Sequence, residues 1–207
     1  TPESKTYSRV KKNGWRRFPA LVKPAAEHCS YGIEPEAVVD DPDQLKARIE
    51  YVLEAYKTPA LVEEFIDGTE YNVSIWGNGR IKVLPLNAID FTAFDDYHER
   101  LVGYDAKWSP GTDAWNLTTC HCPADVDAAL RKRIETTARG AYKALKVRDY
   151  GRIDLRVRDG VPYVLDVNSN PDITMEGGFA RSARAAGFDY GQTIVQILDF
   201  ASARMPK

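Results

Sequence analysis

Cysteine is scarce in this sequence, and long apolar runs are absent from it. Three cysteines among 207 residues form a small, odd set that excludes a disulfide framework and favours a reducing compartment. No segment approaches the roughly 18 consecutive apolar residues of a membrane-spanning helix. Residues 1–6 contain no apolar leader either. We therefore expect a cytoplasmic protein without a membrane partner.

A surplus of either charge is also missing. The 28 Lys and Arg residues are matched by 30 Asp and Glu residues, which leaves a formal net charge of −2 at pH 7. Nucleic-acid binding draws much of its affinity from a basic surplus, so we expect no nucleic-acid partner. The chain does have 43% hydrophobic residues, enough for the core of one large domain or two small ones.

The spacing of apolar residues predicts a mixture of strands and helices. An amphipathic helix is expected to begin at Asp41-Pro42, an N-cap followed by proline in the first turn, and to end near residue 57. Further helices are predicted over 126–145, 179–186 and 189–201, and strands over 18–23, 60–66, 71–75, 81–84, 153–157 and 161–167. Strands and helices are segregated rather than strictly alternating, which favours an α+β fold.

Residues 89–122 follow neither the helical nor the strand period. Asp, Gly, Trp and Tyr are scattered through this segment without a repeat. An unpatterned segment of this length inside a compact domain is usually a lid or a binding loop. We expect it to cover a ligand.

Charged residues are concentrated in the last predicted hairpin. Apolar residues take the odd positions of both strands, whereas Arg152, Asp154, Asp166 and Asn168 take even positions. Because side chains alternate between the faces of a sheet, the two apolar sets share a face only if the connecting loop has an odd length. A three-residue loop with Gly160 in the left-handed conformation meets this condition. The four polar residues then emerge together on the opposite face.

Two interpretations of this polar group remain open. Two carboxylates and an amide oxygen on one rigid hairpin suit Mg²⁺, with room left for phosphate oxygens. Alternatively, arginines and aspartates pair across the strands and form a solvated polar face. The turn-forming residues 168–172, directly after the hairpin, favour a ligand site at this position.

The same hairpin is one of five segments that together resemble a known family. The segments are Lys23-Pro24 and residues 62–70, 104–107, 151–154 and 165–171. In this order they resemble the ATP-grasp domain of the D-alanine–D-alanine ligases, and the resemblance covers essentially the whole chain. It implies an α+β ATP-grasp fold in which two subdomains, residues 1–67 and 68–207, grip ATP between antiparallel sheets. It also implies that the family's N-terminal substrate domain is absent from these residues.

The resemblance implies a set of nucleotide-binding residues. They are Lys23, Glu27, Ser30, Glu63, Glu64, Phe65, Ile66, Glu70 and Lys107. Lys23 and Lys107 would contact the phosphates of ATP. Glu63 would accept a hydrogen bond from the adenine amino group, and Glu70 would bind the ribose.

The resemblance also implies a metal site and two catalytic residues. Asp154, Asp166 and Asn168 would hold two Mg²⁺ ions, or Mn²⁺ in their place. Lys107 would reach the phosphates when its loop closes, and Arg152 would face the acyl group undergoing substitution. Without the resemblance, cation–π packing against Tyr104 and Trp108 would explain Lys107. Arg152 would then merely pair with Asp166 across the hairpin.

The implied activity is that of an ATP-dependent carboxylate–amine ligase that forms an amide or peptide bond through an acyl phosphate. Its partners would be small amino-acid or peptide substrates, and family members are commonly dimers, so a homodimer is expected. Several positions depart from the family pattern: Cys29 in the phosphate loop, Trp108 after the loop lysine, Asp166 for glutamate, Asp172 for glycine, and Gly177-Gly178 for a serine–leucine step. These departures favour an acceptor other than D-alanine.

Two alternatives to the ligase remain open. A phosphotransferase would stop after phosphoryl transfer, as some ATP-grasp relatives do. A nucleotide-binding regulatory module would bind ATP without turnover. Product analysis separates the first alternative from the ligase, and an ATPase assay separates the second.

Overall fold

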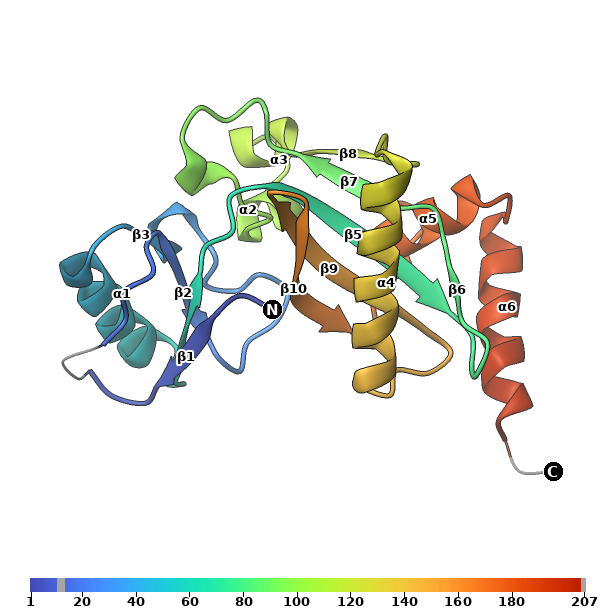
Figure 1. Ribbon diagram of the computed structural model, residues 1–207, viewed down its shortest axis with the longest axis horizontal. Helices are drawn as coiled ribbons and strands as arrows, with labels where there is room; N and C mark the ends of the chain where they lie inside the picture. The colour runs from blue at the N-terminus through green and yellow to red at the C-terminus, as the bar shows by residue number, and fades with distance from the viewer. Residues whose placement is uncertain (11–13, 206–207) are drawn as a thin grey trace. The chain divides into compact units, whose positions relative to one another are not determined.

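The computed structural model describes residues 1–10 and 14–205 (Figure 1). The chain forms two compact units: residues 1–67 with 91–119, and residues 68–90 with 120–207. It passes from the first unit to the second after Asp67. Residues 91–119 return to the first unit, whereas the subdomains expected from the sequence place them with residues 68–207. No helix of the described residues is both long enough and apolar enough to cross a membrane.

The first unit is built on a four-stranded antiparallel sheet. Its strands are β1 (Ser4–Tyr7), β2 (Ala20–Pro24), β3 (Val38–Val39) and β4 (Ala60–Glu64), in the order β1-β4-β2-β3. One face packs against α1 (Pro42–Ala55), and the core between them contains Val22, Val62, Leu45, Ile49 and Val52. Sequence patterning predicts this layer because β2 alternates in burial and α1 carries one apolar stripe.

The start of α1 follows the predicted capping signal. The Asp41 side chain accepts hydrogen bonds from the backbone N–H groups of Asp43 and Gln44, and Pro42 occupies the first turn. A short helix, η1 (Pro35–Ala37), precedes β3.

Residues 91–119 contain regular structure, although the sequence shows neither a helical nor a strand period there. They contain η2 (Tyr97–Glu99), α2 (Tyr104–Trp108) and α3 (Asp113–Leu117). Each helix spans five residues or fewer, too short for a 3.6-residue period to be visible in the sequence.

The second unit is built on a larger sheet. Its strands are β5 (Thr69–Trp76), β6 (Lys82–Val83), β7 (Asn87–Asp90), β8 (Thr119–His121), β9 (Tyr150–Arg158) and β10 (Val161–Asn168). The order is β10-β9-β5-β7-β8, with β6 paired to β5. The helices are α4 (Ala128–Ala144), α5 (Gly178–Ala185) and α6 (Tyr190–Ala203). Figure 1 shows α4, in yellow, lying across the sheet. The helices α5 and α6, in orange and red, lie to the right of the sheet in the same view.

The two faces of this sheet differ in chemistry. The α4 face is apolar, and its core includes Tyr71, Val73, Ile153, Leu155, Ile134 and Tyr142. The opposite face carries Glu70, Asn72 and Ser74 of β5, which pair with Arg156, Asp154 and Arg152 of β9. Because paired residues of antiparallel strands point to the same side, these six polar side chains share one face.

The hairpin between β9 and β10 differs from the sequence prediction in its loop. The loop has two residues, Asp159 and Gly160, both with positive φ (52° and 72°), as in a type I′ turn. The predicted three-residue loop is therefore wrong. A two-residue loop pairs odd positions with even ones, for example Val164 with Leu155.

A register shift in β10 then brings the polar residues together. The shift lies between Val164 and Asp166, where one extra residue restores even–even pairing. Beyond it, Asp166 lies opposite Asp154 and Asn168 lies opposite Arg152. The four polar residues of the hairpin therefore share one face by way of a bulge rather than by loop length.

Candidate functional site

Asp154 is the centre of a hydrogen-bonded cluster on the polar face of the second unit. Arg152 donates from Nε to Oδ1 and from Nη2 to Oδ2, both at 2.7 Å. Asn72 donates to Oδ1 at 2.9 Å, and Asn168 donates to Oδ2 at 3.0 Å. Four N–H groups thus satisfy the acceptor sites of a carboxylate that is only 9% exposed.

Asp166 supplies the second carboxylate of this cluster. It lies directly across from Asp154 in the register and is itself exposed. One of its oxygens accepts a hydrogen bond from the backbone N–H of Val167 at 2.8 Å, which leaves the other oxygen toward solvent. The hairpin thus presents one buried and one exposed carboxylate on the same side.

The donor set of this cluster fits a hard divalent cation. Among residues 1–10 and 14–205, no three His, Cys, Asp or Glu side chains converge on one point, so the candidate site consists of two carboxylates and the Asn168 amide. Mg²⁺ is typically held by one or two carboxylates, with water and phosphate completing the shell. Asn168 directs its nitrogen to Asp154, and a half-turn of the amide would present its oxygen instead.

Arg152 remains charged within this cluster. Burial would lower the pKa of its guanidinium, but the carboxylates of Asp154, Glu70 and Asp166 raise that pKa above its ordinary value. Its ion pair is with Asp154 on its own strand, rather than with Asp166 across the hairpin. Arg152 was expected to pair with Asp166 across the strands, so this pairing within one strand differs from the prediction.

Glu70 is paired next to the cluster. Its Oε2 lies 3.0 Å from Nε of Arg156, and the two residues are 7% and 3% exposed. The pair fixes the Glu70 carboxylate on the same face as Asp154. The residue predicted to bind the ribose therefore lies on the same sheet face as Asp154, one of the residues predicted to bind the metal.

Two asparagines of this face were missed by the sequence analysis. Asn72 touches Asp154, and Asn87 is fully buried, where it donates to the Gly178 carbonyl at 3.1 Å and the Ser182 hydroxyl at 2.8 Å. Asn72 stands two residues after Glu70 on one strand, and that alternation could have revealed it. Asn87 has no such signal, because its partners come from α5.

In the first unit, Lys23 and Glu63 form an ion pair. The Lys23 Nζ lies 2.5 Å from Glu63 Oε2, and the side chains are 20% and 11% exposed. Lys23 comes from the end of β2 and Glu63 from the neighbouring β4. Two of the residues predicted to contact opposite ends of a nucleotide thus lie in direct contact here.

The other residues predicted to bind the nucleotide differ in how deeply they are buried. Phe65 and Ile66 are buried, and the Phe65 ring lies 6.1 Å from that of Tyr97. Glu64 lies 3.7 Å from the Arg17 guanidinium. Glu27 is exposed in the loop after β2. The structure therefore brings Lys23 and Glu63 together but leaves Glu27 at a distance in the loop.

A second lysine is held against the loop after β2. Lys107 of α2 donates to the Ser30 hydroxyl at 2.7 Å, and Ser30 donates onward to the Val102 carbonyl at 2.7 Å. Trp108 donates from its indole to the Cys29 carbonyl at 3.3 Å. The segment 91–119 is therefore joined to residues 29–30 by polar contacts, with a lysine at the point of contact.

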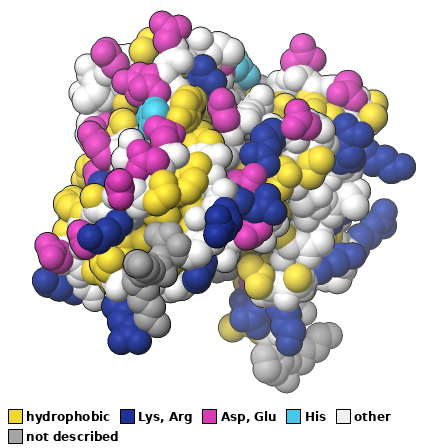
Figure 2. Space-filling model, turned by 60° about the vertical axis from the view of Figure 1, so that its left-hand side comes forward, with side chains coloured by type: hydrophobic (Ala, Val, Ile, Leu, Met, Phe, Trp, Pro, Cys, Tyr) yellow, Lys and Arg dark blue, Asp and Glu magenta, His cyan; other side chains and the backbone are white. Residues whose placement is uncertain are grey.

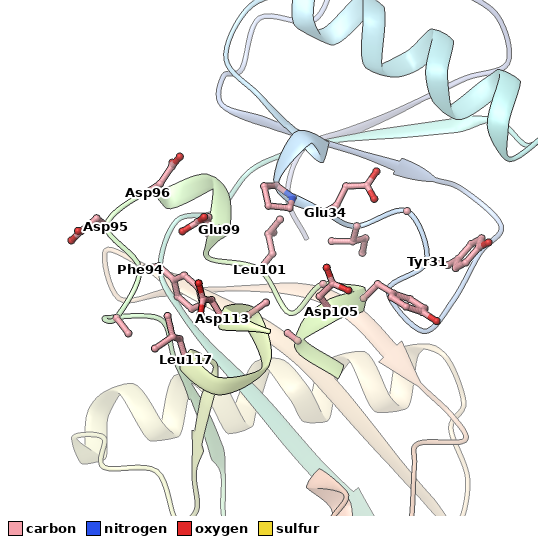
Figure 3. Close-up of a pocket in the computed structure, with 18 of the residues that line it drawn as sticks. Tyr31, Glu34, Phe94, Asp95, Asp96, Glu99, Leu101, Asp105, Asp113 and Leu117 are labelled. Atoms are coloured by element: carbon pink, nitrogen blue, oxygen red, sulfur yellow. The ribbon is translucent and has the colours of Figure 1, made fainter. Parts of the chain in front are cut away.

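The first unit also contains a pocket of about 550 Å³ between the segments 31–35 and 93–117 (Figure 3). Its lining includes six carboxylates: Glu34, Asp95, Asp96, Glu99, Asp105 and Asp113. Among residues 1–10 and 14–205, no Lys, Arg or His lines it. Such a pocket repels phosphate groups, so it does not replace the surface around Lys23 and Lys107 as the candidate nucleotide site.

Figure 2 shows one face of the molecule, on which acidic and basic side chains are both present among apolar ones.

Two α+β units on antiparallel sheets, one with paired lysine and glutamate and the other with a carboxylate-bearing hairpin, define an ATP-grasp fold. The family described as D-ala D-ala ligase C-terminus matches residues 2–199. The chain belongs to this family.

Several relatives support the same membership. The uncharacterized protein y4sG of Sinorhizobium fredii (strain NBRC 101917 / NGR234) is 33% identical over 189 residues, which are 91% of this chain and 53% of that protein. A D-alanine–D-alanine ligase of Bacillus anthracis is 32% identical over 183 residues, 88% of this chain and 54% of the ligase. The chain therefore spans about half the length of the curated relatives that it matches.

Solved structures agree with these sequence matches. The crystal structure of D-alanine–D-alanine ligase from Bacillus anthracis complexed with ATP has a TM-score of 0.75 at 25% identity, over 98% of this chain and 60% of that one. VanG D-Ala:D-Ser ligase from Enterococcus faecalis has a TM-score of 0.73 at 25% identity, over 96% of this chain and 56% of that one.

Proposed function

We propose that this chain is the nucleotide- and metal-binding part of an ATP-dependent carboxylate–amine ligase. The observation that carries the proposal is the register that sets Asp166 opposite Asp154 and Asn168 opposite Arg152. One face of a rigid hairpin then offers oxygen ligands for a cation beside a guanidinium. The B. anthracis relative, which is a ligase solved with ATP, supports the same assignment.

The proposed cofactors are ATP and divalent cations, with Mg²⁺ favoured and Mn²⁺ able to replace it. Asp154, Asp166 and Asn168 would hold up to two ions, and Glu70 would bind the ribose. Glu63, Glu64, Phe65 and Ile66 would form the adenine site, and Glu27 and Ser30 belong to the loop beside the phosphates. When bound, the cations would neutralise phosphate charge and hold the phosphoryl group in line for transfer.

The lysines and Arg152 would perform the remaining steps. Lys23 and Lys107 would add positive charge where the phosphoryl group moves from ATP to the carboxylate. Arg152 would orient the acyl group, and its planar fork suits the oxyanion that forms when an amine displaces the phosphate. The segment 91–119, joined to Ser30 through Lys107, would exclude water that could hydrolyse the acyl phosphate.

The proposed substrates are amino acids or short peptides, with an acceptor other than D-alanine. One relative is a D-Ala:D-Ser ligase by name, so acceptors vary within the fold. The family's serine–leucine step is replaced here by Gly177 and Gly178. The Asp172 carboxylate, at a position where the family has glycine, accepts hydrogen bonds from the Thr174 N–H and hydroxyl at 2.8 and 2.9 Å, which hold it within the turn after β10. A homodimer is the proposed assembly.

The proposal is tested by product analysis of the full-length protein. Incubation with γ-labelled ATP, Mg²⁺ and a panel of D- and L-amino acids should yield inorganic phosphate and an amide in equal amounts. Asp154→Asn should lower turnover by about a thousandfold, since a transition-state charge partner is lost. Asp159→Asn, at the hairpin turn, is the matched control and should retain activity, because asparagine tolerates positive φ.

Two outcomes would overturn the ligase assignment. A stable phosphorylated product without an amide would identify a phosphotransferase. Tight ATP binding with no hydrolysis under any substrate combination would identify a regulatory module.

A further inference from the structure

Arg152 and Asp154 form an unusually complete ion pair. Two N–H groups of one guanidinium meet the two oxygens of one carboxylate at 2.7 Å each. The side chains are 15% and 13% exposed, so water screens the pair only weakly. Parallel hydrogen bonds of this fork type are the strongest that arginine makes with a carboxylate. The two residues stand at positions i and i+2 of β9, so the sheet itself sets their distance.

The remaining acceptor sites of Asp154 are also used. Each carboxylate oxygen accepts about two hydrogen bonds in its plane. Asn72 provides the second donor to Oδ1 and Asn168 the second donor to Oδ2. A cation that binds Asp154 must therefore displace at least one of these donors. Arg152 supplies two of the four N–H groups and is the only charged residue among the three donors, so it also repels an incoming cation.

We propose that Arg152 and the divalent cation exchange at Asp154. This inference rests on the proposed function, because it concerns the same metal site. Cation binding breaks the Arg152–Asp154 fork and releases the guanidinium from the carboxylate. Metal binding and the availability of Arg152 for an acyl group then become a single coupled event.

The charges on this face show which form of the cation the exchange favours. Asp154 and Asp166 contribute two negative charges and Arg152 one positive charge. A free divalent cation gains little from this net charge and must also break the fork. A metal–nucleotide complex brings its own phosphate oxygens, to which a released guanidinium can donate. The site is thus built to take the cation together with a nucleotide rather than alone.

Binding of Mn²⁺ to the full-length protein tests the exchange without reference to activity. Free Mn²⁺ is measured by electron paramagnetic resonance in a titration without nucleotide. Arg152→Met should bind Mn²⁺ roughly tenfold more tightly than the unaltered protein, since one charge-assisted pair no longer has to be broken. Arg152→Lys, which keeps the charge but lacks the fork, should fall between the two.

Arg158→Met is the matched control. Arg158 lies on the same strand, four residues beyond Asp154, with its guanidinium 5.4 Å from the Tyr163 ring centroid. This variant removes the same charge about 13 Å from Asp154 along the strand, where salt screens it. Its Mn²⁺ affinity should equal that of the unaltered protein. Equal tightening in Arg158→Met and Arg152→Met would attribute the effect to net charge and overturn the exchange.

A parallel titration with ADP separates this inference from the proposed function. If neither the unaltered protein nor Asp154→Asn binds Mn²⁺ in the presence of ADP, the proposed metal site itself is wrong. If the unaltered protein binds Mn²⁺ with ADP, yet Arg152→Met and Arg152→Lys show unchanged or weaker nucleotide-free binding, only the exchange fails. Thermal unfolding of every variant confirms that the proteins compared are folded.

Discussion

The two units hold their charged residues in different ways. In the second unit, Arg152, Asp154, Glu70 and Arg156 alternate along paired central strands and are almost fully buried in ion pairs. In the first unit, a lysine at a strand end contacts a glutamate (Lys23 to Glu63), and a lysine on a five-residue helix contacts a serine (Lys107 to Ser30). Side chains on a sheet face are held in place before anything binds, whereas lysines at strand ends and on short helices can move when a nucleotide binds.

The two units should also differ in how much stability a substitution of a charged residue costs. Removing one partner of a buried ion pair leaves a desolvated charge, which costs much more than the loss of an exposed pair. Substitutions in the Arg152–Asp154 cluster should therefore affect stability and ligand binding together. Substitutions at Lys107, which is partly exposed, should affect ligand binding with little change in stability.

Among the substitutions that test this comparison, the largest effect is expected for Lys23→Met, which tests whether the first unit behaves as described. Loss of the ammonium should lower the affinity for ADP by about ten- to a hundredfold, because a direct charge partner of the phosphates is removed. Glu63, 8% exposed, loses its partner as well, so the melting temperature should fall modestly. Calorimetric titration and thermal unfolding measure the two effects.

Lys46→Met is the control for this substitution. Lys46 lies on α1, 3.8 Å from Glu50, with 61% of its side chain exposed. Its removal should change neither ADP affinity nor melting temperature measurably. Unchanged ADP binding in Lys23→Met would place the nucleotide elsewhere and remove the contrast between the units.

The long helices α1, α4, α5 and α6 and the polar strand positions were predictable from the sequence because their signals are local. The Asp41 cap and the stripe of α1 lie within one segment, and the capping box of α6, between Asp189 and Gln192, does so too. The strict alternation around Arg152 and Asp154 likewise indicated one polar face.

The parts that could not be predicted depend on distant residues. Asp159-Gly160 is a typical two-residue hairpin signal, but the parity of the flanking strands favoured an odd loop. Parity is restored by the register shift before Asp166, which no glycine or proline marks. The contact of Lys107 with Ser30 joins residues 77 apart in sequence, so no local pattern reveals it.

A smaller effect is expected when the hairpin turn is altered, and it tests how firmly the second sheet fixes its register. Gly160→Ala should lower the free energy of unfolding by about 1 kcal/mol, because alanine is strained at φ +72°. Gly140→Ala, at an exposed position inside α4 with no atom within 4 Å of the new methyl group, should raise it by about 0.5–1 kcal/mol. Chemical denaturation measures both, and the same sign in both variants would contradict the turn assignment.

The smallest effect concerns the contact that holds segment 91–119 within the first unit. His98 lies 2.6 Å from Asp96 and 2.9 Å from Asp40, and the Tyr97 hydroxyl also donates to Asp40. Burial lowers the pKa of His98, but its hydrogen bonds to the two carboxylates raise it above the ordinary value. The hydrogen bond to Asp40 raises the pKa of Tyr97 to about 12, so the phenol stays protonated at neutral pH.

The sign of the pH dependence follows from the raised pKa of His98. A group whose pKa is higher in the folded protein stabilises the fold fully below its unfolded pKa of about 6.5, and this contribution is lost as pH rises through the folded value. Amide hydrogens of η2 should therefore exchange about two- to threefold faster at pH 8.5 than at pH 5.5, after correction for intrinsic rates. His98→Gln should show no such difference. Equal protection at both pH values in the unaltered protein would mean that the lysine-bearing segment is held by its other contacts, and that the first unit is as firmly arranged as the second.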